Sequence, residues 1–581
     1  MASPWASRDV GIFDTKRMAG LRLLLIPAVA LLFLGLGANT IWDANEAFYA
    51  DTPRQMVLSG DYVNPIFNGE ARMNKPVLSY WVVAGLYKVF GLSLTVERFG
   101  IALGALGILL AAYLCGRAVR SPLTGWLAVL IVVTAPRFVM FSRRIFIDIW
   151  VTMFMGLSSG CFLLAEAFPE RRRLWLGLMY VAIGLGVLTK GPVALVFPVA
   201  TIGAWLLVER RLSDIKRLWI VPGALIVLAI NAPWWGAIYA QHGMEPLQAF
   251  WLGENFGRYT EPMQPSERDV WFYVPVVIGD LFPWSIFVMV GLVTGVAALW
   301  SRVRNTDAPS PDAASVSHAI KRFLMIWVAL LVGVFSFSET KQDLYVFPII
   351  PALAALAADA ILTGLNRGGA RLRVAFIATA VLLIVGGAGI ASLFGFSAPT
   401  HQISGTNALG ATLVAGGLVV FVLAVMERAQ AATLALAGTM VVANYIFVLV
   451  SLPAVEAFKP VLPMVQTIQA RTRPGAPPVV AHYITSLPSF VYYLERPVEG
   501  YFDLRPLIER ARTVPEMYIL MRPHEYAAFE PAARAQSIEP CIVLRRTLFE
   551  AKLKLVLQGR SWPEVFLVGT GAACAPRTPR A

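Results

Sequence analysis

Charged side chains are concentrated in residues 42–80, directly after the first long apolar run of this 581-residue chain. The ionisable residues there are Asp43, Glu46, Asp51, Arg54, Asp61, Glu70, Arg72 and Lys75. A carboxylate can take a proton from an acceptor hydroxyl or amine, and cations can stabilise a departing phosphate. Because unpaired charge beside a bilayer is costly, this segment is the first candidate for a functional site.

Further ionisable residues lie at the ends of later apolar runs: Arg137, Arg143, Arg144, Asp148, Lys190, Arg258, Asp280, Glu339, Lys341 and Asp343, followed by Tyr345. Arg143 and Arg144 lie on the membrane face that is normally poor in cations, so we expect an anionic partner for them, either Asp148 or a ligand phosphate. Carboxylates and cations on one face match a reaction of an anionic, lipid-held substrate, and glycosyl transfer from a polyprenyl phosphate is a reaction with this requirement.

The elements that must position these residues are membrane helices. The chain is 57% hydrophobic and 15% charged, whereas a soluble domain is roughly a quarter charged. A helix of ~20 apolar residues crosses the hydrocarbon core. Such runs predict about thirteen helices near residues 19–37, 96–116, 122–140, 148–167, 174–189, 191–208, 218–235, 271–299, 323–337, 344–362, 373–396, 409–426 and 431–452.

The net charge of +13 is explained by topology. Basic residues, such as the run Arg171 to Arg173, fall in alternate short loops and mark one face as cytoplasmic. This distribution argues against a nucleic-acid partner. It predicts a multi-pass membrane protein with a cytoplasmic N-terminus, and it places the charged first loop and the C-terminal part on the outside.

The expected organisation is a cytoplasmic segment (1–18), a transmembrane domain (19–452) with external loops at 38–95 and 236–270, and a periplasmic α/β domain (453–581). Within the first loop, Glu46 to Leu58 is predicted to be a helix capped by Asn45. Short β-like runs at 478–482, 517–521 and 541–544 predict the α/β domain. Its two cysteines, Cys541 and Cys574, can form a disulfide in an oxidising compartment, or Cys574 can stay unpaired in its Pro- and Ala-rich end.

The run DANEAFYADTPRQMVLSGDYVNPIFNGEARMNKPVLSYW, which begins at Asp43, resembles the first external loop of the aminoarabinose lipid A transferases and their protein O-mannosyltransferase-like relatives. These belong to the C-type glycosyltransferase superfamily. Supporting matches are RRIFID at 143–148, TKG at 189–191, PWW, GENFGRY, FPWS and SETKQDLYVFPIIP. The resemblance implies a polyprenyl-phosphate sugar donor and inverting transfer on the extracytoplasmic, periplasmic side of a bacterial inner membrane. The acceptor would be lipid A, another glycan or a protein.

The resemblance also assigns site residues. The family's acid pair usually reads Asp-Glu, but here it reads Asn45 and Glu46, with Asp43 two places earlier, so the catalytic base is either Asp43 or Glu46. Asp148 matches the second acidic position. The residues that match donor-phosphate contacts or the donor pocket are Lys75, Lys190, Lys341 and Tyr345. Arg54, Arg143, Arg144 and Arg258 are further candidates, although Arg54 can instead pair with Glu46 or Asp51 on its own helix.

A departure from the family concerns metal. Some relatives have Glu before the lysine of the KP motif and His after the seventh span, where this chain has Asn74 and Asn255. Two amides make a poor zinc site, so we expect no tightly bound metal or cofactor, and dependence on a divalent ion stays open.

Two other hypotheses compete with the enzyme. A transporter or flippase of a lipid-linked sugar would also place polar groups beside a helix bundle, but it predicts charges near mid-bilayer. An inactive relative that acts as a receptor is the third hypothesis, and Asn45, Asn74 and Asn255 keep it open.

Overall fold

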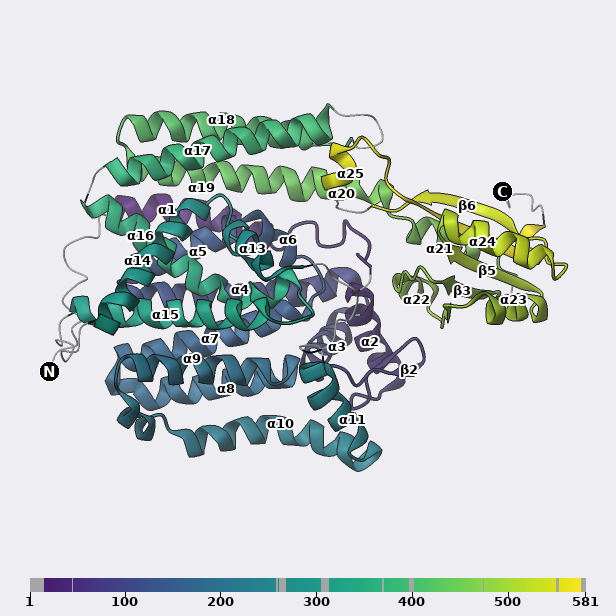
Figure 1. Cartoon of the computed structure of the whole chain (residues 1–581), viewed down its shortest axis with the longest axis horizontal. Coiled ribbons are helices and arrows are strands. Elements are labelled where there is room, and N and C mark those ends of the chain that lie inside the picture. The colour runs from purple at the N-terminus through teal and green to yellow at the C-terminus, as the bar shows by residue number, and fades with distance from the viewer. Residues whose placement is uncertain are drawn as a thin grey trace.

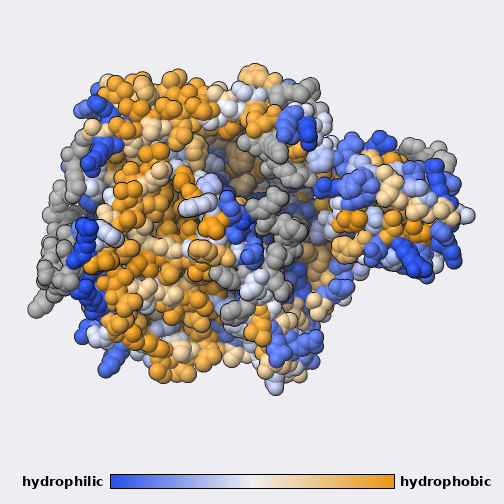
Figure 2. Space-filling model, viewed as in Figure 1, coloured by the Kyte–Doolittle hydropathy of each residue, from blue (hydrophilic) through white to orange (hydrophobic). Residues whose placement is uncertain are grey.

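A computed structural model describes residues 15–43, 45–257, 260, 268–304, 313–367, 370–396, 402–473, 475–549 and 553–575. Its larger part is a bundle of helices, and a smaller part with a β-sheet lies at one end of the bundle (Figure 1). Figure 2 shows hydrophobic residues along the flank of the bundle and hydrophilic residues at its far end and over the sheet-containing part. This distribution is the one expected of a multi-pass membrane protein.

Ten helices among the described residues are long and apolar enough to cross a membrane. They are α4 (Leu94–Val119), α7 (Ile147–Ala167), α8 (Arg172–Lys190), α10 (Ile220–His242), α14 (Ser285–Arg304), α15 (Ala313–Ser336), α16 (Ile350–Arg367), α17 (Ala370–Ile390), α18 (Thr406–Val425) and α19 (Ala429–Ile446). Three shorter apolar helices pack with them, namely α1 (Thr15–Leu31), α5 (Pro122–Thr134) and α9 (Val193–Val208). The expected polytopic helical fold is confirmed, and the count of thirteen spans stays a prediction.

The run at 271–299 is not one continuous helix. It contains α13 (Tyr273–Gly279) and α14, separated by a turn that includes Pro283. A proline has no backbone N–H to donate, and it interrupts the helical hydrogen bonds. Because Pro283 does not interrupt the apolar character of the run, the length rule alone did not reveal the break. Within this turn, the Asp280 carboxylate lies 2.6 Å from Nε of Arg137, which precedes the fourth predicted span.

Small residues allow the helices to approach closely. A Cβ atom on Gly387 of α17 would lie 2.7 Å from the carbonyl oxygen of Gly410 on α18. Membrane helices use such positions because backbone contact replaces the hydrophobic effect as the packing force. The packed pair α17 and α18 continues into α19, and the three helices form a layer along one side of the bundle (Figure 1).

The first external loop is an ordered cap on the bundle. It contains α2 (Asn45–Ser59), a short hairpin of β1 (Ile66–Phe67) and β2 (Glu70–Ala71), and α3 (Leu78–Phe90). The observed α2 is one residue longer at each end than the predicted helix. Shorter helices elsewhere in the bundle are α6 (Pro136–Phe141), α11 (Glu245–Gln248) and α20 (Leu452–Ala454).

The C-terminal part is an α/β unit with a five-stranded sheet in the order β4-β3-β5-β7-β6. The strands are β3 (Val479–Tyr483), β4 (Glu499–Tyr501), β5 (Glu516–Met521), β6 (Cys541–Thr547) and β7 (Glu564–Gly571). β3 pairs in parallel with β4 and β5, and β7 runs antiparallel to β5 and β6. The helices are α21 (Val461–Arg471), α22 (Ser489–Leu494), α23 (Leu504–Thr513), α24 (Pro523–Arg534) and α25 (Leu553–Leu557). The expected C-terminal α/β fold is confirmed.

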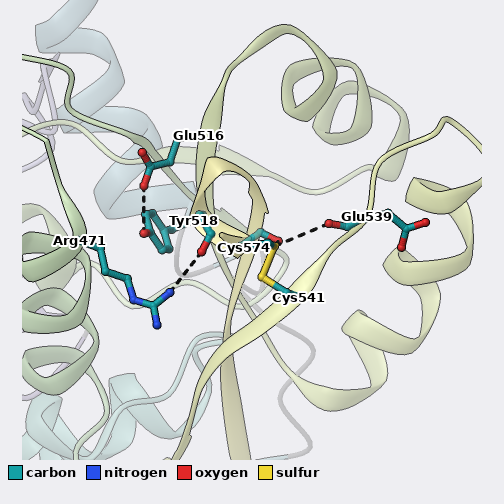
Figure 3. The surroundings of a disulfide bond; sticks show 8 residues. Arg471, Glu516, Tyr518, Glu539, Cys541 and Cys574 are labelled. Atoms are coloured by element: carbon teal, nitrogen blue, oxygen red, sulfur yellow. Dashed lines mark hydrogen bonds between the residues drawn. A yellow bond between two sulfur atoms is a disulfide. The ribbon is translucent and has the colours of Figure 1, made fainter. Parts of the chain in front are cut away.

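Cys541 and Cys574 form a disulfide with an S–S distance of 2.06 Å (Figure 3). It joins the start of β6 to the segment after β7. Arg471 supports this segment because its Nη1 donates a hydrogen bond of 3.2 Å to the carbonyl oxygen of Ala573. Of the two alternatives that the sequence left open for Cys574, the disulfide with Cys541 is therefore the one that the structure contains.

Candidate functional site

A cleft at one end of the helix bundle contains four of the predicted site residues: Lys75, Asp148, Lys190 and Tyr345. We call it the outer cleft. Its cavity measures about 100 Å³, and its other polar lining residues are Glu254, Asn255 and Ser338. The rest of the lining is apolar and comes mainly from α7, α9 and α15: Val151, Met155, Val193, Phe197, Leu331 and Phe335, with Leu344 and Pro348.

Two ion pairs form the polar end of the outer cleft. Lys75 Nζ lies 2.9 Å from Glu254 Oε2, and Lys190 Nζ contacts the Asp148 carboxylate. All four side chains are at most about one quarter exposed. The Lys190 ammonium also lies 5.3 Å from the ring centroid of Tyr345, within the range of a cation–π interaction. The cleft therefore presents two lysines that already hold carboxylates.

Helix ends place one of these pairs. Asp148 is in the first turn of α7, where the helix dipole favours negative charge, and Lys190 is the last residue of α8, where it favours positive charge. Gly191 ends α8 with φ +89°, and a Cβ atom there would lie 2.5 Å from the Phe250 ring. The Lys-Gly-Pro sequence thus ends the helix at the residue that forms the ion pair.

Lys341 lies close to this cleft, although it is not part of the lining. Its Nζ donates a hydrogen bond of 2.7 Å to the carbonyl oxygen of Ser338, which does line the cleft. Arg258 lies outside the described residues. The structure therefore groups Lys75, Lys190, Tyr345 and Asp148, and it places Lys341 beside them.

Asp43 lies apart from the outer cleft, at the contact between the first loop and the C-terminal α/β unit. Its Oδ1 accepts a hydrogen bond of 2.7 Å from the Ser489 backbone N–H, and its Oδ2 accepts one of 2.6 Å from the Ser489 hydroxyl. Burial raises the pKa of Asp43 to about 6, although both hydrogen bonds lower it. Asp43 is thus both a carboxylate of unusual proton affinity and a link to α22.

Glu46 is fully buried between two arginines. Its Oε1 lies 2.7 Å from Arg144 Nε and its Oε2 lies 3.6 Å from Arg98 Nη2. Glu46 is therefore the anionic partner of Arg144, whereas the sequence had suggested Asp148 or a phosphate. The partners of Arg143 are backbone groups, since it donates hydrogen bonds to the carbonyl oxygens of Leu31 and Leu34.

A second cavity of about 390 Å³, which we call the lateral cavity, lies beside these arginines. Its polar lining residues are Asn39, Trp42, Arg98, Arg143, Arg144, Thr406 and Ser451. The other lining residues are mostly apolar and include Ile390, Phe394 and Leu409 from the α17 and α18 region. The predicted residues are thus divided between two cavities, with Arg143 and Arg144 at one and the lysines at the other.

Arg54 has the structural role that its own helix suggested. It forms an ion pair with the buried carboxylate of Asp51, and its Nη1 donates a hydrogen bond of 2.8 Å to the carbonyl oxygen of Tyr492. Its guanidinium also lies 4.7 Å from the Tyr492 ring centroid. Arg54 therefore fixes α22 of the α/β unit to the first loop.

Three residues of the site were not predicted as site residues from the sequence. Glu254 lies in the aromatic second loop, where a charged side chain among aromatic residues could have indicated it. Arg98 follows Glu97 in the first turns of α4, and a charged residue inside an apolar helix could have indicated it. No signal indicated Ser489, because 446 residues separate it from Asp43.

Asn74 and Asn255 occupy the two positions where some relatives have Glu and His, and each amide offers a single oxygen ligand. Asn255 Nδ2 donates a hydrogen bond of 2.7 Å to the carbonyl oxygen of Phe250, and the neighbouring Glu254 is paired with Lys75. Within the described part of the chain, no group of three or more His, Cys, Asp or Glu residues lies together.

The helix bundle, the capping first loop and the charged outer cleft define a polytopic membrane protein with the C-type glycosyltransferase fold. The structure of ArnT from Cupriavidus metallidurans superimposes with a TM-score of 0.74 at 20% identity, over 96% of this chain and 99% of that one. The same protein bound to undecaprenyl phosphate gives the same TM-score and identity, over 96% and 100% of the two chains. Residues 19–243 match the family described as dolichyl-phosphate-mannose-protein mannosyltransferase.

Among curated proteins, an uncharacterized protein of Aquifex aeolicus is 30% identical over 58% of this chain and 63% of its own length. The undecaprenyl phosphate-alpha-4-amino-4-deoxy-L-arabinose arabinosyl transferase 2 of Pseudomonas fluorescens is 29% identical over 61% and 58%. The chain thus spans about three fifths of these two relatives. An arabinosyl transferase of Edwardsiella ictaluri is 29% identical over 69% of this chain and 70% of its own length. The predicted resemblance to the aminoarabinose transferases is confirmed.

Proposed function

We propose that this protein transfers a sugar from a polyprenyl-phosphate donor to an acceptor on the extracytoplasmic face of the bacterial inner membrane, with inversion at the anomeric carbon. The observation that carries the proposal is the outer cleft, where two lysines lie at the polar end of an apolar slot. The names of the arabinosyl transferases and the ArnT complex with undecaprenyl phosphate support a donor of this class.

The slot suits an isoprenoid phosphate. Val151 and Met155 follow Asp148 on one face of α7, and Val193 and Phe197 lie one turn apart on α9. An apolar chain packed along these helices would leave its phosphate beside Lys75 and Lys190. Because both lysines hold carboxylates, the phosphate must compete with Glu254 and Asp148 for them.

The chemistry follows from these charges. A carboxylate takes the proton of the acceptor hydroxyl or amine, and the acceptor atom attacks the anomeric carbon from the side opposite the phosphate. The bond between that carbon and the phosphate oxygen breaks, and polyprenyl phosphate leaves with the electron pair. Lys75 and Lys190 stabilise the departing charge, with Lys341 and Tyr345 beside them.

Asp43 and Glu46 are the proposed candidates for the base, with Asp148 orienting the acceptor. Arg143 and Arg144 line the lateral cavity, which suits an acceptor that carries anionic groups, whether lipid A, another glycan or a protein. Arg258 keeps its proposed role at the donor. The proposed orientation has a cytoplasmic N-terminus and a periplasmic α/β domain from residue 453, consistent with the basic loops of the opposite face.

The test is transfer of a labelled sugar from a synthetic undecaprenyl-phosphate donor by the purified full-length protein. We expect turnover in the wild type and loss of turnover in either Asp43→Asn or Glu46→Gln. Asp61→Asn is the matched control, because Asp61 is an acid of the same loop that bonds only local groups, including Asn64. Full activity in both Asp43→Asn and Glu46→Gln contradicts the base assignment. Donor binding without turnover supports a receptor, and donor movement across vesicles without transfer supports a flippase.

A further inference from the structure

A third cavity, larger than the outer cleft and the lateral cavity, has no place in the proposed reaction. It measures about 1120 Å³, above the roughly 300–1,000 Å³ of ordinary small-molecule pockets. Residues of α14, α15, α16 and α17 line it, together with the junction of α4 and α5. The lining residues near its polar end come from the end of α4, the end of α14 and the start of α17. We call it the inner cavity.

The polar end of the inner cavity is a built arrangement of charges. Asp359 of α16 is 3% exposed. Its Oδ1 lies 2.6 Å from Arg120 Nε and its Oδ2 lies 2.5 Å from Lys321 Nζ. Arg120 also donates a hydrogen bond of 2.6 Å to the Thr363 hydroxyl. The buried carboxylate thus holds two cations at the cavity wall and neutralises only one of them.

A third cation adds to the excess. Arg371, in the first turn of α17, lines the same cavity and is exposed. Among the described residues, no carboxylate forms an ion pair with it. Among the described lining residues, three cations face one carboxylate, and His318 is the remaining ionisable group. This balance favours an anion.

The inner cavity has apolar walls away from its polar end. Deeper lining residues on α14 are Phe287 and Val290, and those on α17 are Val374 and Ala375. The side chains of Val290 and Val374 are 40% and 60% exposed, so apolar surface continues from the cavity to the flank of the bundle. A site that is cationic at its end and apolar along its length fits an amphipathic anion, and it would leave a free phosphate without contacts along most of its walls.

We propose that the inner cavity binds one anionic phospholipid, with the headgroup phosphate at Arg371, Arg120 and Lys321 and the acyl chains between α14 and α17. In the orientation proposed above, this lipid comes from the cytoplasmic leaflet, where basic pockets between helices are known to bind anionic headgroups. The lipid occupies the boundary between the layer of α17, α18 and α19 and the rest of the bundle (Figure 1). Its binding stabilises that boundary.

Arg373 offers a matched control. It lies two residues after Arg371 on the same helix, it is 45% exposed, and its Nη1 lies 3.0 Å from Glu427 Oε1. It is not part of the cavity lining. Arg371→Ala and Arg373→Ala therefore remove the same charge from the same end of the same helix, and only the first removes it from the cavity.

The experiment is titration of the full-length protein in detergent with phosphatidylglycerol or phosphatidylcholine, followed by native mass spectrometry. We expect tighter retention of one phosphatidylglycerol than of phosphatidylcholine. We expect about fivefold weaker phosphatidylglycerol binding in Arg371→Ala, as one basic residue near an anionic lipid predicts, and a larger loss in Arg371→Glu. Arg373→Ala should bind as the wild type does. Equal retention of the two lipids, or equal losses in Arg371→Ala and Arg373→Ala, overturns the proposal. Because lipid retention is measured directly, the outcome is independent of glycosyl transfer.

Discussion

Removing the Ser489 hydroxyl distinguishes the two candidate bases. This hydroxyl donates a hydrogen bond of 2.6 Å to Asp43, whose pKa burial raises to about 6. A hydrogen bond to a charged group contributes about 1.5–3 kcal/mol, and one pKa unit corresponds to about 1.4 kcal/mol. Since the bond favours the ionised carboxylate, Ser489→Ala should raise the pKa of Asp43 by a further one to two units, roughly.

The consequence for activity follows from the sign of this shift. A base must be ionised, so activity is lost as the pH falls through its pKa. If Asp43 is the base, the acid limb of kcat/KM lies near pH 6 in the wild type. It moves to about pH 7–8 in Ser489→Ala by the same arithmetic. If Glu46 is the base, the limb does not move, because the contacts of Glu46 with Arg144 and Arg98 are intact.

The assay is sugar transfer measured between pH 5 and 9, with Ser486→Ala as the control. Ser486 lies three residues before Ser489, but its hydroxyl is 3.3 Å from His482 Nδ1. We expect its profile to match that of the wild type. An unchanged acid limb in Ser489→Ala, together with turnover in Asp43→Asn, refutes the assignment of Asp43 as the base. Asp43 would then be a positioning residue that joins the first loop to α22.

Three other outcomes test the site and the fold. Lys75→Ala should weaken donor binding roughly tenfold to a hundredfold, measured as KM, because it removes a charge-assisted phosphate contact. Glu254→Gln alone should strengthen donor binding, because it removes an anion that competes for Lys75, and an unchanged KM in that variant would refute the competition. Arg144→Ala should destabilise the protein by about 3–5 kcal/mol in thermal unfolding, since Glu46 is fully buried, and an unchanged transition would contradict that pairing. Cys541→Ser opens a disulfide of sequence separation 33, which by loop entropy costs about 3.7 kcal/mol; proteolysis under denaturant should then cleave the α/β unit earlier, and reducing agent should reproduce the effect in the wild type.

The sequence predicted a helix or strand well where the residues that determine its ends lie within a few positions of one another. The first-loop helix was expected from Glu46 to Leu58 and spans Asn45 to Ser59. Asn45 marks the start of this helix and Gly60 follows its last residue, so neighbouring residues indicated both ends and no distant contact was needed. β7 was missed for the opposite reason: its pairing with β5 and β6 depends on residues far along the chain.

The site residues were predicted one by one, but apart from the pairing of Arg54 with Asp51 within one helix, their partners were not predicted. Asp148 and Lys190 each stood out as charges at the ends of apolar runs, and their ion pair became visible only when α7 and α8 were packed together. The same holds for Glu46, whose position at a helix start was clear, whereas its two arginines come from α4 and from the turn before α7. The residue type defines the charge of a side chain, whereas packing decides whether another side chain neutralises that charge.

That distinction changes how the outer cleft works. From the sequence, Lys75 and Lys190 are cations that could bind a phosphate. In the structure, each already forms an ion pair with a carboxylate. In the proposed reaction, the donor phosphate exchanges with an existing anion at each lysine, and its net affinity is the difference between its own ion pair with the lysine and the ion pair of the carboxylate that it displaces. If the phosphate takes Lys190, the Asp148 carboxylate loses its partner while the donor is bound. Such a cleft keeps its charges paired when it is empty, and it makes the Asp148 carboxylate available only when the donor phosphate is present.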